Sequence, residues 1–143
     1  MTWPIGMGQR FKGVYHLYED CIYPYRGEVK APLESPEKIM GLQSEAVRAF
    51  LGDDWAAFEA EIELVRGASH EFDQELYLAG QLSPVYFGTA LRNFGVMEML
   101  DGFVSMSPSP LPRTTTGAAV DPNDPEFSGF VFKIQANMDP KHR

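Results

Sequence analysis

The sequence predicts an α/β fold, because strand-like and helix-like patterns alternate along the chain. Residues 11–18 alternate between two faces in the manner of a strand, and residues 43–66 carry apolar side chains at helical spacing. Residues 84–104 then predict a strand, a short turn and a helix, an order typical of an open α/β sheet. With 143 residues, 44% of them apolar, the chain is long enough to bury a core without disulfides or metal.

The first strand is predicted over residues 11–18, where aromatic and β-branched side chains are frequent. Its odd-numbered residues would share one face and its even-numbered residues the other. A turn at 19–20 leads to a second short strand at 21–23. We therefore expect a hairpin.

Two less regular segments flank this hairpin. Gly6, Gly8 and Gly13 lie at its start, and we expect them to permit a tight entry into it. Residues 24–41 contain three prolines and show no clear period, which predicts a loop with an edge strand near Val29.

An apolar stripe at steps of three or four residues predicts helical structure over 43–66. Its members are Val47, Phe50, Leu51, Trp55, Phe58, Ile62 and Val65. Gly52 is expected to divide the stretch, with Asp53 capping the second helix. Ser69 is expected to cap a third, short helix that ends at Gly80.

The last third of the chain contains three stretches of different composition. The apolar run 84–88 predicts a buried strand, and 96–104 predicts a helix that begins just after Gly95. Five prolines between residues 107 and 125 predict a linker. Beyond it, the alternation over 130–135 predicts a half-buried strand. Because a lone strand has no sheet of its own, we expect the chain to be a piece of something longer.

Composition excludes several classes of function. The formal charge of −8 argues against a nucleic-acid-binding surface, direct DNA binding included. The single cysteine, Cys21, excludes an internal disulfide and a CxxC site, and a packed thiol is expected. No run approaches the roughly 18 apolar residues of a membrane helix, and the N-terminus does not resemble a signal peptide. A soluble, cytoplasmic protein without membrane contact is therefore expected.

The sequence holds no established catalytic or metal-binding spacing. His16, His70 and His142 are scattered, so we expect packed or surface histidines and no metal site. Carboxylates are frequent in one region, and solvation on polar helix faces explains them better than a hydrolase site: Glu59, Glu61, Glu63, Glu71, Asp73 and Glu75. The segment 84–96 offers backbone N–H groups at the end of a predicted strand, although an ordinary strand–helix turn would look the same.

The same segment resembles a nucleotide-binding motif. Phe87-Gly-Thr-Ala-Leu91, followed by Asn93-Phe-Gly-Val96, resembles the fifth guanine-nucleotide motif of translational GTPases. Further matching stretches are Trp3-Pro-Ile-Gly6, Phe11-Lys-Gly-Val14, Glu63-Leu-Val-Arg-Gly-Ala68, Leu100-Asp-Gly-Phe103, Pro108-Ser-Pro110 and, most specific, Gly129-Phe-Val-Phe-Lys-Ile-Gln-Ala-Asn-Met-Asp-Pro-Lys-His-Arg143. Together they resemble the class II peptide chain release factors, the release factor three family, over nearly the whole chain. Elongation factor G is similar in outline but matches less well.

This resemblance implies a specific anatomy. Residues 1–80 would be the α+β subdomain that such proteins insert into their P-loop GTPase domain, and residues 81–107 would be the last strand and helix of that domain. Residues 108–125 would be a linker, and residues 126–143 would open the following β-barrel domain. The terminal strand would then belong to that barrel.

The resemblance also implies a function. In such GTPases the backbone N–H of the alanine, here Ala90, contacts guanine O6; Thr89 would brace the loop, and Leu91 replaces the lysine of small GTPases. The whole protein would bind GTP or GDP with Mg²⁺ and release class I release factors from the ribosome in translation termination. This chain lacks the P-loop, switch and NKxD motifs, so alone it is expected to be inactive.

Two alternatives stay open. The chain could be the equivalent piece of elongation factor G. It could also be a self-contained, acidic and non-enzymatic interaction module that docks a partner through the stripe over 47–65 or through the hairpin. The terminal apolar strand over 130–136 separates the alternatives: a self-contained module should protect it from hydrogen exchange, whereas a fragment should leave its edge exposed. The exposed edge predicts self-association through it.

Overall fold

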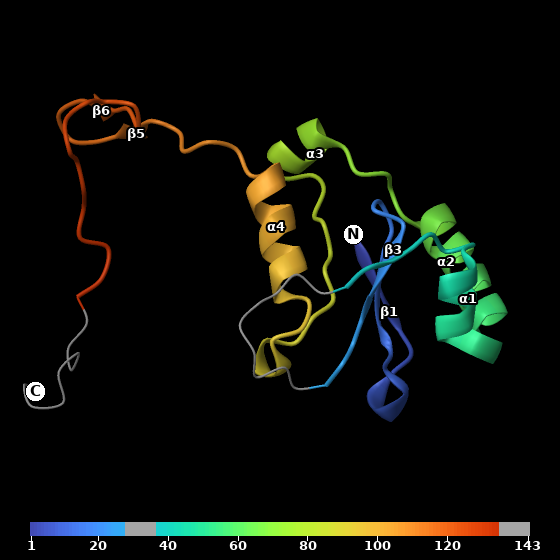
Figure 1. Cartoon of the computed structure of the whole chain (residues 1–143). Helices are drawn as coiled ribbons and strands as arrows, with labels where there is room; N and C mark the ends of the chain where they lie inside the picture. The colour runs from blue at the N-terminus through green and yellow to red at the C-terminus, as the bar shows by residue number, and fades with distance from the viewer. Residues whose placement is uncertain (28–36, 135–143) are drawn as a thin grey trace, which may run out of the picture. The chain divides into compact units, whose positions relative to one another are not determined.

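A computed structural model describes residues 1–27 and 37–134 of the chain. It has two compact units, Met1–Ser107 and Pro108–Arg143. The first unit combines helices and strands (Figure 1), so the α/β class is confirmed at that level. Its sheet is antiparallel throughout, and the predicted open α/β sheet is therefore wrong. The first three strands are joined by short turns, and such connections allow only antiparallel pairing.

Four strands make up this sheet, in the order of the sequence. They are β1 (Thr2–Ile5), β2 (Gly13–His16), β3 (Cys21–Pro24) and β4 (Ile39–Met40). Strand β2 lies inside the sheet, where Tyr15 pairs with Trp3 on one side and with Ile22 on the other. The expected hairpin of β2 and β3 is confirmed. Val29, proposed for an edge strand, lies outside the described residues.

The two faces of β2 are covered by different clusters. Tyr15 faces a core made with Ile5, Ile22, Leu42, Val47, Leu51, Phe58 and Ile62. Val14 points the other way, into a smaller cluster with Cys21, Tyr23, Phe11 and Phe94. The predicted alternation of faces is confirmed, although neither face meets solvent. The sheet is therefore an inner layer of this unit.

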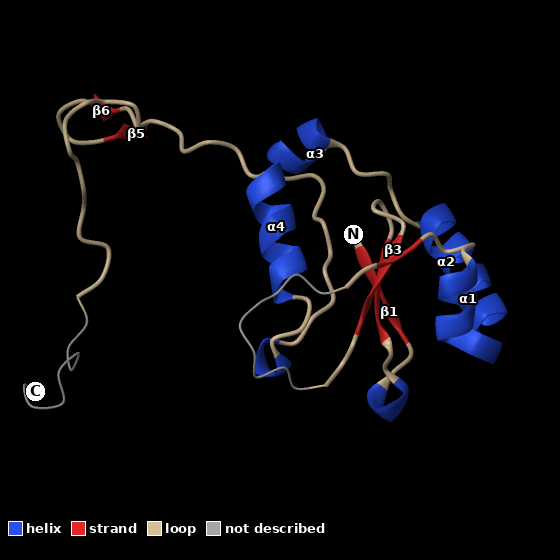
Figure 2. Cartoon of the chain, viewed as in Figure 1, coloured by secondary structure: helices blue, strands red, loops and turns tan. Residues whose placement is uncertain are grey.

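The helical stripe forms α1 (Glu45–Leu51) and α2 (Trp55–Ala68), divided at Gly52 as expected. A short 3₁₀ turn, η2 (Gly52–Asp54), joins them. Both helices lie on one side of the sheet and α4 (Val96–Met106) lies on the other (Figure 2). The stripe is buried against the sheet and so has no free face with which to dock a partner.

The expected helix caps are wrong at two positions. Asp53 lies within η2. Asp54 precedes α2 without a capping hydrogen bond, because its backbone is already helical, whereas a capping residue is extended; its carboxylate binds Lys12 (2.8 Å). Ser69 follows α2; the third helix, α3 (Gln74–Leu78), is instead capped by the Asp73 carboxylate. Helix α3 is thus capped by an aspartate that lies a few residues beyond Ser69, an equally suitable side chain.

Residues 84–88 do not form the buried strand that their composition predicts. The segment is extended and half exposed, and its hydrogen bonds to the sheet go to Thr2, the first residue of β1. The Thr2 N–H donates to the Val85 carbonyl (3.2 Å), and the Phe87 N–H donates to the Thr2 hydroxyl (2.8 Å). Within the described residues no second strand covers its other edge. The helix predicted after Gly95 is confirmed as α4.

The second unit is less regular than the first. A small hairpin of β5 (Arg113–Thr114) and β6 (Ala119–Val120) occupies the stretch predicted as linker. Residues 130–134 are exposed and form no strand with any described residue, so the half-buried strand predicted there is wrong over this range. Residues 135–143 lie outside the described part of the chain.

Candidate functional site

The loop between residues 88 and 95 is closed by its own backbone. The Thr89 N–H donates to the Phe94 carbonyl (2.8 Å), and the Phe94 N–H donates back to Thr89 (3.1 Å). Between them lies one 3₁₀ turn, η3 (Ala90–Arg92), and Asn93 adopts the left-handed conformation that ends it. These bonds fix the backbone path of the loop without help from its side chains.

Two glycines permit this closure. A Cβ at Gly88 would lie 2.7 Å from the Phe94 carbonyl oxygen, and a Cβ at Gly95 would lie 2.6 Å from the Phe87 carbonyl oxygen. Neither approach is sterically possible for another residue, because the obstacle in each case is rigid backbone. The glycines of the motif therefore stand where the geometry of the loop requires them.

The predicted site residues occupy different places on this loop. Thr89 is half buried and supplies the closing bonds, whereas the side chains of Ala90 and Leu91 face solvent. Leu91 is 90% exposed. A contact from this loop to a ligand would thus come from backbone N–H groups at the start of η3 and would not depend on the identity of residue 91.

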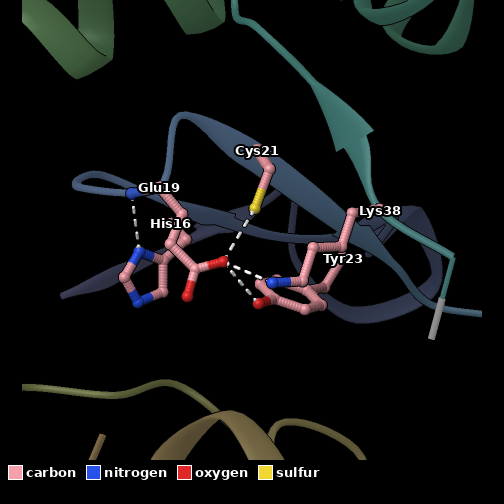
Figure 3. Close-up of polar contacts among 5 residues, drawn as sticks. All are labelled: His16, Glu19, Cys21, Tyr23 and Lys38. Carbon is pink, nitrogen blue, oxygen red and sulfur yellow. Dashed lines mark hydrogen bonds and ion pairs between the residues drawn. The ribbon is translucent and has the colours of Figure 1, made fainter. Parts of the chain in front are cut away.

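A second arrangement, which the sequence does not predict, is a polar cluster around Glu19 at the hairpin turn (Figure 3). The Glu19 carboxylate accepts hydrogen bonds from Lys38 (2.6 Å) and from the Tyr23 hydroxyl (2.9 Å). The Cys21 thiol lies 3.6 Å from the same oxygen. Lys38 follows a proline-rich stretch without a clear hydrophobic period. The sequence therefore offers no spacing from which its pairing with Glu19 could be predicted.

The chemistry of this cluster is that of a structural network. The hydrogen bond from Lys38 holds the pKa of Glu19 below its usual range. Burial raises the pKa of the Cys21 thiol to about 11, so the thiol stays protonated at neutral pH. A protonated, buried thiol is a poor nucleophile. The expectation that Cys21 is a packed strand thiol is confirmed.

His16 completes the cluster and is only 7% exposed. Its Nδ1 atom accepts a hydrogen bond from the Glu19 N–H (3.1 Å), which helps to close the hairpin turn. Burial lowers the pKa of His16, so the ring is neutral at pH 7. A neutral imidazole that accepts at Nδ1 carries its proton at Nε2.

Stability should therefore fall as the pH drops below about 6.5, the ordinary pKa of an unfolded histidine. The unfolded state then binds a proton that the folded His16 resists, and linkage favours unfolding. Urea unfolding between about pH 7 and pH 5 would measure the slope. His16→Asn, which keeps an acceptor, should flatten it; His70→Asn, at an exposed position, should not. Equal slopes in wild type and His16→Asn would contradict this account.

The polar cluster forms one wall of a cavity of about 480 Å³, and α4 forms the opposite wall. Glu98, Asp101 and Ser105 of α4 line it together with aromatic rings that include Tyr86. Close packing of Tyr86 on α4 is possible because residue 102 is glycine, whose missing Cβ leaves room for the phenol oxygen. The cavity is therefore bounded on several sides by rigid elements.

The other residues considered from sequence do not converge on a site. Among the carboxylates of 59–75, Glu59 accepts from Gln43, Glu61 accepts from the Trp3 indole (3.0 Å) and Asp73 caps α3. Glu59 is partly buried and the other five carboxylates lie at exposed positions, as expected for solvated helix faces. His70 is also exposed, and His142 lies outside the described residues.

No protein-family model matches the sequence. Over residues 1–27 and 37–134, no group of three or more histidine, cysteine or acidic side chains could hold a metal ion. In the same part of the chain, none of the helices combines the length and apolarity needed to cross a bilayer.

Proposed function

We propose that this chain is part of a translational GTPase similar to the class II peptide chain release factors. In this proposal the loop 88–95 forms one edge of the guanine site. The observation that carries the proposal is the agreement between motif and geometry: Gly88 and Gly95 stand where the loop tolerates no Cβ, and Ala90 begins the 3₁₀ turn.

The contact itself would use the backbone. The Ala90 N–H, at the first position of η3, would donate to guanine O6, while the Thr89–Phe94 pair holds the loop in place. Leu91 turns its side chain to solvent, so the absence of lysine at this position leaves the contact intact. Such backbone recognition resembles other nucleotide loops, in which N–H groups do the binding.

The rest of the chemistry would come from other parts of the protein. Phosphoryl transfer needs a phosphate cradle, magnesium ligands and a positioned water. With those, the whole protein would bind GTP or GDP with Mg²⁺ on the ribosome, in the cytoplasm, and drive class I release factors off after peptide release. This chain would supply the guanine loop and the inserted subdomain, and would not hydrolyse GTP alone.

Ala90→Pro tests the proposal in the protein expressed from the full reading frame that encodes this chain. Thr89 is already extended (ψ 113°), the conformation preferred before proline, and proline suits the first position of a helical turn. The change therefore removes the N–H with little strain. We expect GDP affinity to fall roughly tenfold or more, the effect of losing one hydrogen bond to a buried polar ligand group.

Ala90→Gly is the matched control, because it keeps the N–H and should leave GDP affinity nearly unchanged. Titration with a fluorescent guanine nucleotide would measure both variants. Equal affinity of Ala90→Pro and wild type would show that the loop does not read guanine. A reading frame without an upstream GxxxxGK[ST] and Asn-Lys-x-Asp would overturn the assignment as a GTPase altogether.

One observation favours the alternative of an interaction module. Helix α4 exposes four large apolar side chains: Met99, Leu100, Phe103 and Val104. In a GTPase this face would be covered by the remainder of the domain, whereas a free-standing module would use it to bind a partner. The same reading-frame analysis separates the two proposals.

A further inference from the structure

Three aromatic rings from distant parts of the sequence meet beside the loop 88–95. The centre of the Phe94 ring lies 5.6 Å from that of Phe11 and 5.3 Å from that of Tyr25, and both pairs are edge to face. Phe11 and Tyr25 are also in contact, with 5.4 Å between their ring centres. Edge-to-face contacts are a favoured geometry of aromatic pairs. The Phe94 ring is therefore held in a specific place and orientation.

The two rings that contact Phe94 are themselves fixed to the sheet. Phe11 comes shortly before β2, and Tyr25 directly follows β3. The Tyr25 N–H donates to the Lys12 carbonyl (2.8 Å), and the Lys12 N–H donates to the Ile5 carbonyl of β1 (2.8 Å). Phe11 and Phe94 also pack on the smaller cluster of Val14, Cys21 and Tyr23. This end of the sheet therefore presents a preformed contact surface to the loop.

Phe94 also closes the loop through its backbone. Its N–H and its carbonyl make the two closing hydrogen bonds with Thr89. Ala90, whose N–H is the proposed guanine contact, directly follows Thr89. The side chains from Ala90 to Asn93 are exposed, whereas Phe94 is half buried and packs on the cluster of the sheet. A displacement of the Phe94 ring would thus move the bonds that place the Ala90 N–H.

We propose that Phe94 is a positioning residue for the guanine site, and that Phe11 and Tyr25 act on this site through the Phe94 ring. The inference rests on the proposed function for the identity of the ligand, whereas the aromatic contacts themselves do not depend on it. The coupling is reciprocal: loss of the aromatic contacts weakens nucleotide binding, and nucleotide binding strengthens these contacts. The end of the sheet at β2 and β3 thereby influences the affinity of a loop that is distant in the sequence.

Exchange of the Thr89 and Phe94 amide hydrogens with solvent tests the anchoring in this chain without any nucleotide. Tyr25→Ala removes one of the three rings and leaves the sequence of the loop unchanged. We expect both amides to exchange about fivefold faster or more, because the loop opens more often once this contact is lost. Tyr25→Phe keeps the ring and should exchange as the wild type does. Unchanged exchange in Tyr25→Ala would overturn the proposal.

Titration with a fluorescent guanine nucleotide tests the link to binding, in the protein expressed from the full reading frame. Tyr25→Ala should lower GDP affinity about fivefold or more, and Tyr25→Phe should retain the wild-type affinity. Phe94→Ala should lower the affinity at least as much as Tyr25→Ala. The double variant should show no further loss, because Tyr25 acts on the site only through the Phe94 ring. Additive losses would show that the two residues act separately and would overturn the proposal.

Tyr77→Ala is the control for a general loss of stability. It removes another contact between two aromatic rings in the same unit, that of Tyr77 with Phe72, whose centres are 5.9 Å apart. This variant should change neither the exchange of the two loop amides nor GDP affinity. Equal effects of Tyr77→Ala and Tyr25→Ala would contradict a specific role for the three rings.

Failure of this inference can be distinguished from failure of the proposed function. Wild-type GDP affinity in Ala90→Pro would reject the guanine site itself, and the positioning role with it. A loss of affinity in Ala90→Pro without a loss in Tyr25→Ala would reject the positioning role alone. Losses in both variants, with retained affinity in Tyr25→Phe, are the result that we expect.

Discussion

Replacement of Ile62 by alanine is expected to lower the free energy of unfolding by about 2–5 kcal/mol. Ile62 lies in the middle of α2, is completely buried and belongs to the cluster that joins the helices to Tyr15 and Ile22 of the sheet. Truncation removes apolar contact and leaves a cavity between elements that are held in place from several sides. Domains of this size are stable by only about 5–15 kcal/mol, so the loss is a large fraction of the total.

Leu64→Ala provides the matched control. Leu64 lies two residues away on the same helix, but it is 74% exposed. Alanine has a high helix propensity, so this change should alter stability by less than about 0.5 kcal/mol. Urea unfolding followed by circular dichroism would give both values. A similar loss in the two variants would mean that α2 does not pack on the sheet as described.

The helical part of this fold could be predicted because burial alone determines its pattern. Val47, Leu51, Phe58 and Ile62 recur at helical spacing, and all four are buried in one cluster. The hairpin of β2 and β3 was predicted for the same reason, since its side chains alternate between two buried faces. Periodicity reports which side of an element is buried, and here it was sufficient.

The helix caps could not be predicted because neighbouring residues were chemically equivalent. Asp53 and Asp54 are identical side chains, and Ser69 is as good a cap as Asp73. The chain is already helical at Asp54 because η2 runs directly into α2, and the Asp54 carboxylate binds Lys12, more than forty residues away in the sequence. A local pattern contains no information about such a distant partner.

Two apolar segments were predicted as strands but do not form strands, and the reason differs from that for the helix caps. Residues 84–88 and 130–134 have the composition of buried strands, yet the first segment is half exposed and the second is exposed. A strand needs a neighbour for its backbone hydrogen bonds as well as an apolar face. Composition predicts the apolar face, but it does not show whether a neighbouring strand is available for the hydrogen bonds. If the chain is part of a larger GTPase, both segments would find their neighbours there.

The two candidate sites also differ in whether the sequence could predict them. The loop at Thr89, Ala90 and Leu91 was proposed through a resemblance, and its geometry depends on glycines within seven residues of one another. The cavity beside α4 could not be predicted from the sequence, because its lining combines residues as distant along the chain as His16, Lys38 and Asp101. Only the three-dimensional structure shows that Glu98 and Asp101 face the Glu19–Lys38 pair.

The second large effect is expected at Gly13, the first residue of β2. Its φ of +145° is a conformation that residues with a side chain rarely adopt, and a Cβ there would overlap the carbonyl oxygen of Tyr23. The Cα of Pro24 would lie 3.1 Å away. Both obstacles are backbone of the neighbouring strand β3, which cannot move without separating the two strands.

Gly13→Ala should therefore lower the free energy of unfolding by about 3 kcal/mol or more, because strain and steric overlap act together. Gly8→Ala is the control: Gly8 also has a positive φ, +56°, but nothing lies within 4 Å of its Cβ position. It should cost only about 1–2 kcal/mol, the price of the left-handed conformation. Thermal and urea unfolding would measure both, and a smaller loss for Gly13→Ala than for Gly8→Ala would contradict the register of the hairpin.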